Sequence, residues 1–251
     1  MQKLKHITFT GVDGKTDIDR LYEIQKKYPF VEWGILVAKN WRDNGNRYFN
    51  PSFLDVFKNS GLNLSAHMCG SIARSAVNGN IEPFREWSKG NCFIFNRCQL
   101  NISTSKENPD VFKYQGDFAD YFDEVILQQK SVRDCALYLN SKKYAIDNAE
   151  KKSISQFIST IANDSITMLL DASGGLGIDT PIEVYPTANK VGYAGGMNAD
   201  NVAEKLEYLL TNENVGDFWI DMETGVRTED WFDLDKVEKV LEACQEVINK
   251  Q

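Results

Sequence analysis

The sequence has little of what would hold a metal ion or build a disulfide framework. It contains five cysteines, an odd number, with no Cys-x-x-Cys pair, and only two histidines. A zinc site or a disulfide framework is therefore not expected, and the cysteines are expected to be reduced core residues. No long apolar run resembles a signal peptide or a membrane span. The sequence thus predicts a cytoplasmic protein with no membrane partner, no metal and no cofactor.

Basic residues are also in the minority. The 251 residues include 28 Lys and Arg against 36 Asp and Glu, a formal net charge of −8. Nucleic-acid partners favour a basic face, so none is expected here. The hydrophobic share of 42% is enough to fill the core of one large α/β domain. Because no linker or internal repeat interrupts the chain, we expect a single domain over residues 1–251. The oligomeric state stays open.

Short apolar runs alternate with helical patterns along the chain, which is typical of parallel strands in βα units. Strands are expected at 6–10, 31–38, 62–69, 92–101, 125–129, 166–170, 191–194 and 218–220. One or two helices are expected between residues 134 and 160. Ligands of such folds bind at the carboxyl ends of the strands.

The last three apolar runs each end in a polar or glycine-rich turn, where successive backbone N–H groups can form a seat for an anion. The first turn follows Asp171, the second follows Ala194, and the third runs from Asp221 to Arg227. The candidate phosphate-binding residues are Gly174, Gly175, Gly195, Gly196, Thr224 and Gly225, with Ser173 as a further hydroxyl donor.

These three turns, in this order and at these intervals, resemble the last three βα units of phosphoribosylanthranilate isomerase. In that family the sixth strand ends in a catalytic aspartate before a Gly-Gly-Thr-Gly loop, and the seventh and eighth strands end in turns that hold the substrate phosphate. The resemblance implies a (β/α)8 TIM barrel, in which eight parallel strands are surrounded by an outer ring of helices. It also implies a small phosphorylated sugar or ribonucleotide-like ligand, turned over by general acid/base chemistry.

The chain departs from the family at two places. The family's first strand ends in Cys-Gly, with the cysteine as general base, whereas here Thr10 precedes Gly11, and a hydroxyl is too weak an acid to replace a thiolate. Asp221 and Glu223 complicate the phosphate seat, because the family usually has small hydroxyl residues before the last glycine and a carboxylate repels a phosphate. Two functions therefore stay open: a divergent isomerase of the Amadori type or a lyase, and a sensor or sequestering protein that binds a phosphorylated or nucleotide ligand without turnover.

Three residues are catalytic candidates. Asp171 follows an apolar run, precedes a glycine-rich turn and matches the family's general acid, although it could instead cap its own turn. His67 and Cys69 lie near the expected top of the third strand. Either could take part in proton transfer, with Cys69 as a replacement base, or simply pack in the core.

The remaining candidates are substrate-binding residues near the expected strand ends. The loop over residues 39–48 is rich in cations and aromatic residues, which could bind a phosphate and stack on a ring, or simply form a solvated surface loop. Polar residues at period two on the fourth strand would share one face at the barrel mouth, with Phe93 and Phe95 deeper down on the same side. They would either face a ligand or form a satisfied internal network. The substrate-binding candidates are Asp13, Lys39, Arg42, Arg47, Arg97, Gln99, Asn101, Asp221, Glu223 and Arg227.

The pair of carboxylates near the chain's last glycine turn allows several partners. Asp221 and Glu223 are two residues apart and would point the same way from a strand. One of them could pair with Arg227, or both could bind a metal ion or ribose hydroxyls.

Overall fold

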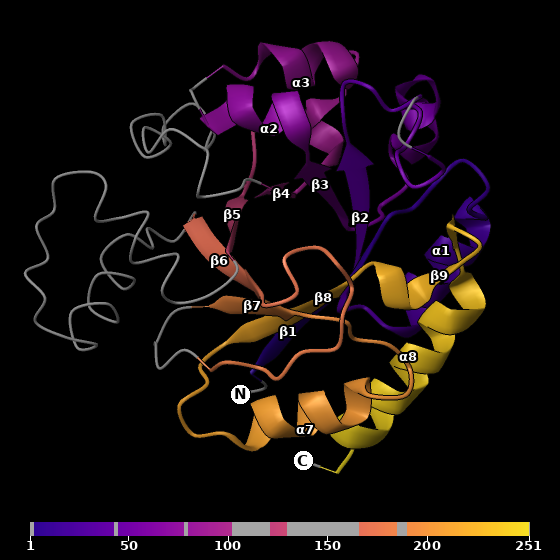
Figure 1. Ribbon diagram of the computed structural model, residues 1–251. Coiled ribbons are helices and arrows are strands. Elements are labelled where there is room, and N and C mark those ends of the chain that lie inside the picture. The colour runs from indigo at the N-terminus through magenta and orange to yellow at the C-terminus, as the bar shows by residue number, and fades with distance from the viewer. Residues whose placement is uncertain are drawn as a thin grey trace, which may run out of the picture.

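The computed structural model describes residues 3–42, 45–77, 80–101, 121–129, 166–184 and 190–250. Cys135 and the helices expected between residues 134 and 160 lie outside these ranges. Within them, eight parallel strands close into a barrel in chain order (Figure 1). The strands are β1 (Leu4–Thr10), β2 (Val31–Val37), β3 (Leu64–Met68), β4 (Arg97–Leu100), β5 (Glu124–Gln129), β6 (Ile166–Asp171), β7 (Val191–Ala194) and β8 (Phe218–Met222). The predicted (β/α)8 barrel is confirmed.

Helices surround this barrel, and their sequences explain where they begin. The described α-helices are α1 (Ile18–Lys27), α2 (Gly70–Val77), α3 (Glu82–Trp87), α7 (Val202–Thr211) and α8 (Leu234–Ile248). The Asp17 side chain accepts hydrogen bonds from the first backbone N–H groups of α1, and Asp233 does the same for α8. Helices α7 and α8 lie side by side and close the ring near the chain ends (Figure 1). Among the described helices, none combines the length and apolar character needed to cross a membrane.

Short 3₁₀ helices and one small hairpin fill the connections. The 3₁₀ helices are η1 (Pro51–Phe57), η2 (Cys92–Ile94) and η4 (Thr224–Val226). The strands β9 (Arg227–Thr228) and β10 (Trp231–Phe232) pair antiparallel after β8. The connection between β2 and β3 thus contains a 3₁₀ helix at residues 51–57.

The fourth strand is shorter than its sequence predicts. Residues 92–94 form η2, and β4 begins only at Arg97. Phe93, expected inside the barrel, is 76% exposed and stacks on Tyr121. An apolar run can therefore precede a strand without belonging to it, because its aromatic side chains can pack on one another at the surface.

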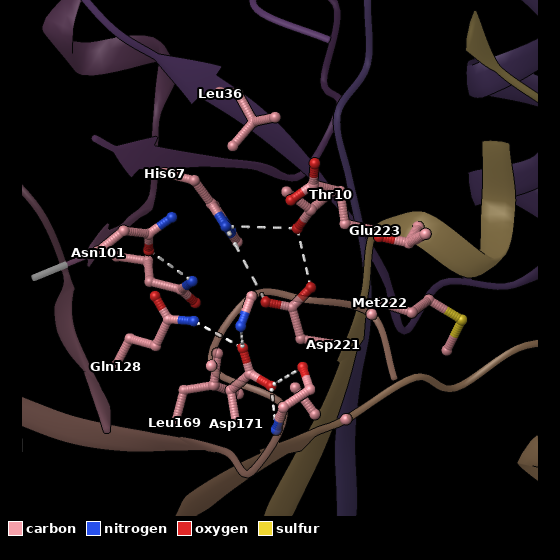
Figure 2. Close-up of a pocket in the computed structure, with 18 of the residues that line it drawn as sticks. Thr10, Leu36, His67, Asn101, Gln128, Leu169, Asp171, Asp221, Met222 and Glu223 are labelled. Carbon is pink, nitrogen blue, oxygen red and sulfur yellow. Dashed lines mark hydrogen bonds and ion pairs between the residues drawn. The ribbon is translucent and has the colours of Figure 1, made fainter. Parts of the chain in front are cut away.

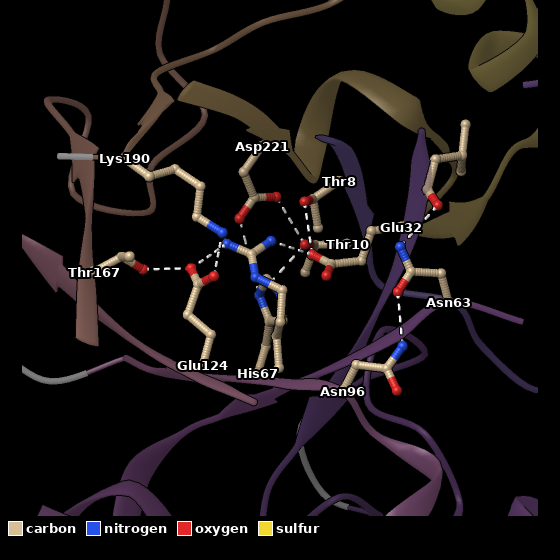
Figure 3. A network of polar contacts seen from close by, with 12 residues as sticks. Thr8, Thr10, Glu32, Asn63, His67, Asn96, Glu124, Thr167, Lys190 and Asp221 are labelled. Carbon is tan, nitrogen blue, oxygen red and sulfur yellow. Dashed lines mark hydrogen bonds and ion pairs between the residues drawn. The ribbon is translucent and has the colours of Figure 1, made fainter. Parts of the chain in front are cut away.

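This shift moves Arg97 to the amino end of β4, so its expected position at the barrel mouth is wrong. Its guanidinium lies inside the lower half of the barrel, where it donates to Glu32 Oε1 and to Glu124 Oε1, both at 2.8 Å. Thr167 also donates to Glu124 at 2.5 Å, and Lys190 pairs with the same carboxylate (Figure 3). A buried charge requires such partners, so Arg97 belongs to the structure of the barrel floor.

Candidate functional site

A cavity of about 500 Å³ opens at the carboxyl ends of the strands (Figure 2). Its size and place are those of a small-molecule site in a β/α barrel. The predicted site residues that line it are Arg47, His67, Cys69, Gln99, Asn101, Asp171, Ser173, Gly174, Gly175, Gly195, Gly196, Asp221, Glu223, Thr224 and Gly225. The closed barrel therefore brings together residues that the sequence places on six strand ends.

Four further candidates stand outside the cavity, in addition to Arg97. Asp13 and Arg227 approach to 3.6 Å and join the loops after β1 and β8, where Arg227 donates to Gly11 O at 2.7 Å and Asp13 accepts from Phe232 N at 2.6 Å. Their role is to hold these loops together. Lys39 is exposed, and Arg42, also exposed, lies over the Trp41 ring at 4.9 Å. The expected substrate contacts of these four residues are corrected accordingly.

Thr10 lies at the centre of a buried polar cluster. Its Oγ1 donates to Asp221 Oδ1 at 2.8 Å and lies 3.3 Å from His67 Nδ1, which is 4.0 Å from Asp221 Oδ2 (Figure 2). The three side chains come from β1, β3 and β8 and are all buried. They form a connected path of hydrogen-bonding groups on the cavity wall.

Burial sets the protonation states of this cluster. Removal from water raises the pKa of Asp221 to about 8, although the hydrogen bond from Thr10 favours the charged form. Burial, with a smaller effect of Arg97, lowers the pKa of His67 to about 3. Near neutral pH, Asp221 is thus mostly a neutral acid and His67 a neutral imidazole. A carboxyl group that keeps its proton at this pH and faces a cavity can serve as a general acid.

The raised pKa of Asp221 gives a first prediction, on stability. Between its ordinary value of 3.8 and about 8, the folded chain keeps a proton that the unfolded chain has lost, so this group makes the folded state less stable as pH rises through that window. Asp221→Asn has no such proton. We expect the variant's Tm to exceed that of the native chain by a margin that grows from pH 5 to pH 8, measured by circular dichroism. A margin that stays constant with pH would contradict the assignment.

Asp171 ends β6 and is held by its own turn. Its Oδ1 accepts from Ser173 N at 3.1 Å and Ser173 Oγ at 2.6 Å, and its Oδ2 accepts from Gln128 Nε2 at 2.8 Å and Gly175 N at 2.5 Å. Four hydrogen bonds fill the acceptor capacity of a carboxylate, and a proton on either oxygen would displace a donor. These contacts support the capping role that the sequence also allowed. Gln128 was not among the predicted site residues. Its one signal in the sequence is that it is polar and follows the apolar residues 125–127.

The glycine turns after β6, β7 and β8 pack backbone against backbone. Gly196 has a φ of 63°, and a Cβ atom there would overlap backbone atoms of Ile178 and Asp179. A Cβ on Gly225 would overlap the carbonyl of Met197. In the described part of the chain, the N–H groups of Gly195, Gly196 and Gly225 have no hydrogen-bond acceptor. Free N–H groups at such close-packed turns form a concavity suited to an anion.

Arg47 extends from the loop after β2 to the end of β8. It donates to Glu223 Oε1 at 3.0 Å and to Asp230 Oδ1 at 2.6 Å. Burial raises the pKa of Glu223, and Arg47 and Arg227 offset part of this effect. Glu223 therefore pairs with Arg47, while Arg227 faces Asp13. Among the described residues, no group of three or more His, Cys, Asp or Glu side chains is placed to hold a metal ion.

Cys69 does not suit the part of a replacement base. Burial raises the pKa of its thiol to about 12, so the thiolate is scarce near neutral pH. Its Sγ accepts a hydrogen bond from Asn101 Nδ2 at 3.4 Å. The thiol is therefore a neutral part of the cavity wall.

Comparisons with known proteins support the fold but do not identify a function. No protein-family profile and no curated protein matches the sequence. N-(5'-phosphoribosyl)anthranilate isomerase from Pyrococcus furiosus is similar with a TM-score of 0.54 and 15% identity, over 96% of this chain and 99% of its own. 3-Hexulose-6-phosphate synthase from Salmonella typhimurium has a TM-score of 0.50 and 11% identity, over 98% and 100%. A xylanase of glycoside hydrolase family 30 from Clostridium acetobutylicum has a TM-score of 0.53 and 11% identity, over 98% of this chain and 73% of its own. The structural similarity establishes a shared barrel. At such low identities it does not establish a shared function, which has to be argued from the site.

Proposed function

We propose that this protein is an enzyme that acts on a small phosphorylated metabolite by general acid/base chemistry at the carboxyl end of its barrel. The observation that carries the proposal is Asp221, a buried acid whose pKa is about 8, on the wall of a cavity that also contains the three glycine turns. Two of the similar structures are named for phosphorylated sugar compounds and the third for a polysaccharide, so the neighbours alone do not select a substrate.

The glycine turns are the proposed phosphate seat. In β/α barrels, a phosphate commonly sits at the loops after the seventh and eighth strands. Here those loops carry the free N–H groups of Gly195, Gly196 and Gly225. The Thr224 hydroxyl and the Arg47 guanidinium line the same cavity and add a donor and a positive charge.

Asp221 is the proposed proton donor, with Thr10 and His67 as its positioning residues. While Asp221 is neutral, it can donate to Thr10 Oγ1, whose hydroxyl then donates to His67 Nδ1. After Asp221 gives its proton to the substrate, the Thr10 hydroxyl turns from His67 Nδ1 and donates to the new carboxylate at the observed 2.8 Å. This rearrangement stabilises the anion without moving a side chain.

Glu223 is the proposed proton acceptor. It lines the cavity two residues from Asp221, and Arg47 at 3.0 Å supports its ionised form. An acid and a base whose environments differ are what an isomerisation or a lyase reaction requires. Within that class, we propose an Amadori-type isomerisation of a phosphorylated sugar derivative as the first reaction to test.

A binder without turnover is the second candidate. The observation that favours it is that Asp171, at the position of the isomerase family's acid, is held by hydrogen bonds to its own turn. In addition, Thr10 stands at the position of that family's base. Incubation with a metabolite extract, followed by mass spectrometry of the bound fraction, separates the two functions. Recovery of an unchanged ligand after long incubation would favour the binder.

Gly196→Ala tests the phosphate seat. The left-handed backbone and the lack of space for a Cβ mean that the turn has to shift. We expect affinity for inorganic phosphate, measured by calorimetry, to fall roughly 10-fold or more, which is about 1.4 kcal/mol or above. Gly14→Ala is the matched control, because a Cβ there meets nothing within 4 Å. Equal phosphate affinity in both variants would remove Gly196 from the seat.

A further inference from the structure

The wall of the cavity that faces β3, β4 and β5 carries no charged side chain of its own. It consists of His67 and Cys69 at the end of β3, Gln99 and Asn101 at the end of β4, and Gln128 on β5. We call these five residues the amide wall. Figure 2 shows His67, Asn101 and Gln128 on one side of the cavity and Glu223 on the other.

The hydrogen bonds of the amide wall leave two buried side-chain atoms without a partner among the described residues, His67 Nε2 and Gln99 Oε1. Gln99 Nε2 donates to Asn101 Oδ1 at 2.9 Å, and Asn101 Nδ2 donates to Cys69 Sγ at 3.4 Å. Gln99 Oε1, however, is buried without a donor, on a side chain that is only 3% exposed. A buried amide oxygen without a partner costs about 1–3 kcal/mol. A ligand hydroxyl or N–H at this point would satisfy it.

Cations are scarce in the lining of the cavity. Among the described lining residues, Arg47 is the only lysine or arginine, and it lies at the β8 side, paired with Glu223. On the amide wall, the imidazole of His67 and the thiol of Cys69 stay neutral because burial lowers the pKa of the first and raises the pKa of the second. A carboxylate placed there would lose its water and face the Gln99 oxygen without a counter-charge.

We propose that the amide wall recognises the uncharged, hydroxyl-bearing part of a substrate that carries a single phosphate, and that it rejects a second anionic group. Gln99 is the specificity-determining residue, because its Oε1 accepts a hydrogen bond from a substrate hydroxyl. The inference rests on the proposed function, which supplies the phosphate seat on the opposite side. It narrows the substrate class to polyhydroxylated monophosphates and disfavours bisphosphates and carboxylated ligands such as an anthranilate.

The proposed preference for an uncharged polyhydroxylated monophosphate is tested by calorimetric affinities of the native protein for four probes. The probes are inorganic phosphate, ribose 5-phosphate, the corresponding aldonic acid 5-phosphate and ribulose 1,5-bisphosphate. We expect ribose 5-phosphate to bind at least about 10-fold more tightly than each of the others. If the aldonate or the bisphosphate binds as tightly as ribose 5-phosphate, the inference is wrong while the phosphate seat stands. If no phosphorylated probe binds, the proposed function fails and the inference fails with it.

Variants of Gln99 test whether this residue determines the substrate preference. Gln99→Leu should lose roughly 10-fold in affinity for ribose 5-phosphate and keep its affinity for inorganic phosphate, whereas Gln99→Lys should shift the preference towards the aldonate. Gln245→Leu, an exposed change on α8, is the matched control and should leave all four affinities unchanged. A parallel loss of both ribose 5-phosphate and inorganic phosphate in Gln99→Leu would overturn the role of Gln99.

Discussion

Replacing Asp221 by asparagine is expected to lower turnover by about 10²–10⁴-fold while leaving ligand affinity within a few fold. Asparagine has nearly the same shape, and its amide oxygen can still accept the hydrogen bond that Thr10 donates at 2.8 Å. What it lacks is the acidic proton that the buried carboxyl keeps near neutral pH. Conversion of aldose and ketose monophosphates followed by NMR, together with calorimetric affinities, measures both quantities.

Asp171→Asn is the matched comparison, because this carboxylate lies in the same cavity. The NH₂ group of the asparagine would face the N–H of Gly175 or of Ser173, and two donors cannot form a hydrogen bond. The turn after β6 should therefore loosen and the Tm should fall. Turnover should fall much less than in Asp221→Asn. The opposite outcome, a large loss of turnover at Asp171 with near-full activity in Asp221→Asn, would return the general acid to the position that the family resemblance implies.

The βα units could be predicted because their signals are local, and the resemblance of the last three turns implied that the units close into a barrel. Each strand is a short apolar run closed by a turn, and the glycines after β6, β7 and β8 mark the strand ends directly in the sequence. The one displaced strand shows the limit of this reasoning. The run at 92–95 has the composition of a strand, but η2 occupies it and Phe93 faces outward, because surface aromatic contacts that the sequence does not encode locally compete with the sheet.

The proposed acid, Asp221, could not be predicted, because its chemistry depends on distant partners. Thr10 meets His67 across 57 residues and Asp221 across 211 residues of chain. In the sequence, Thr10 signals only a missing cysteine, and Asp221 signals a binding residue or an ion-pair partner but not an acid. Closure of the barrel removes water from these groups and changes what they can do. The alternating polar residues on β4 show the same effect, since Arg97 and Gln99 share a face but lie at different depths.

Replacing Arg97 by methionine should cause the largest loss of stability, about 3–5 kcal/mol, because it leaves two buried carboxylates without their shared cation. Glu32 and Glu124 each accept a 2.8 Å hydrogen bond from this guanidinium. In the native protein, burial disfavours the charged form of Glu124, but Arg97 and Lys190 outweigh burial and lower its pKa. Methionine fills a similar volume, so the expected loss reflects charge more than packing. Urea unfolding of the native and variant chains measures it.

The pH dependence of the Arg97→Met variant separates a charge effect from a packing effect. In the native chain, the lowered pKa of Glu124 gives stability that is present above its unfolded value and lost as pH falls. In the variant, Glu124 keeps Lys190 but loses Arg97, so its pKa should rise and the deficit should shrink between pH 8 and pH 5. Adding Glu32→Gln and Glu124→Gln should recover much of the loss at pH 8, since no buried charge then lacks a partner. Arg85→Met, which breaks only an exposed pair with Glu82, should cost less than about 0.5 kcal/mol. A deficit that is equal at pH 5 and pH 8, and unchanged by the glutamines, would mean that Arg97 acts through packing alone.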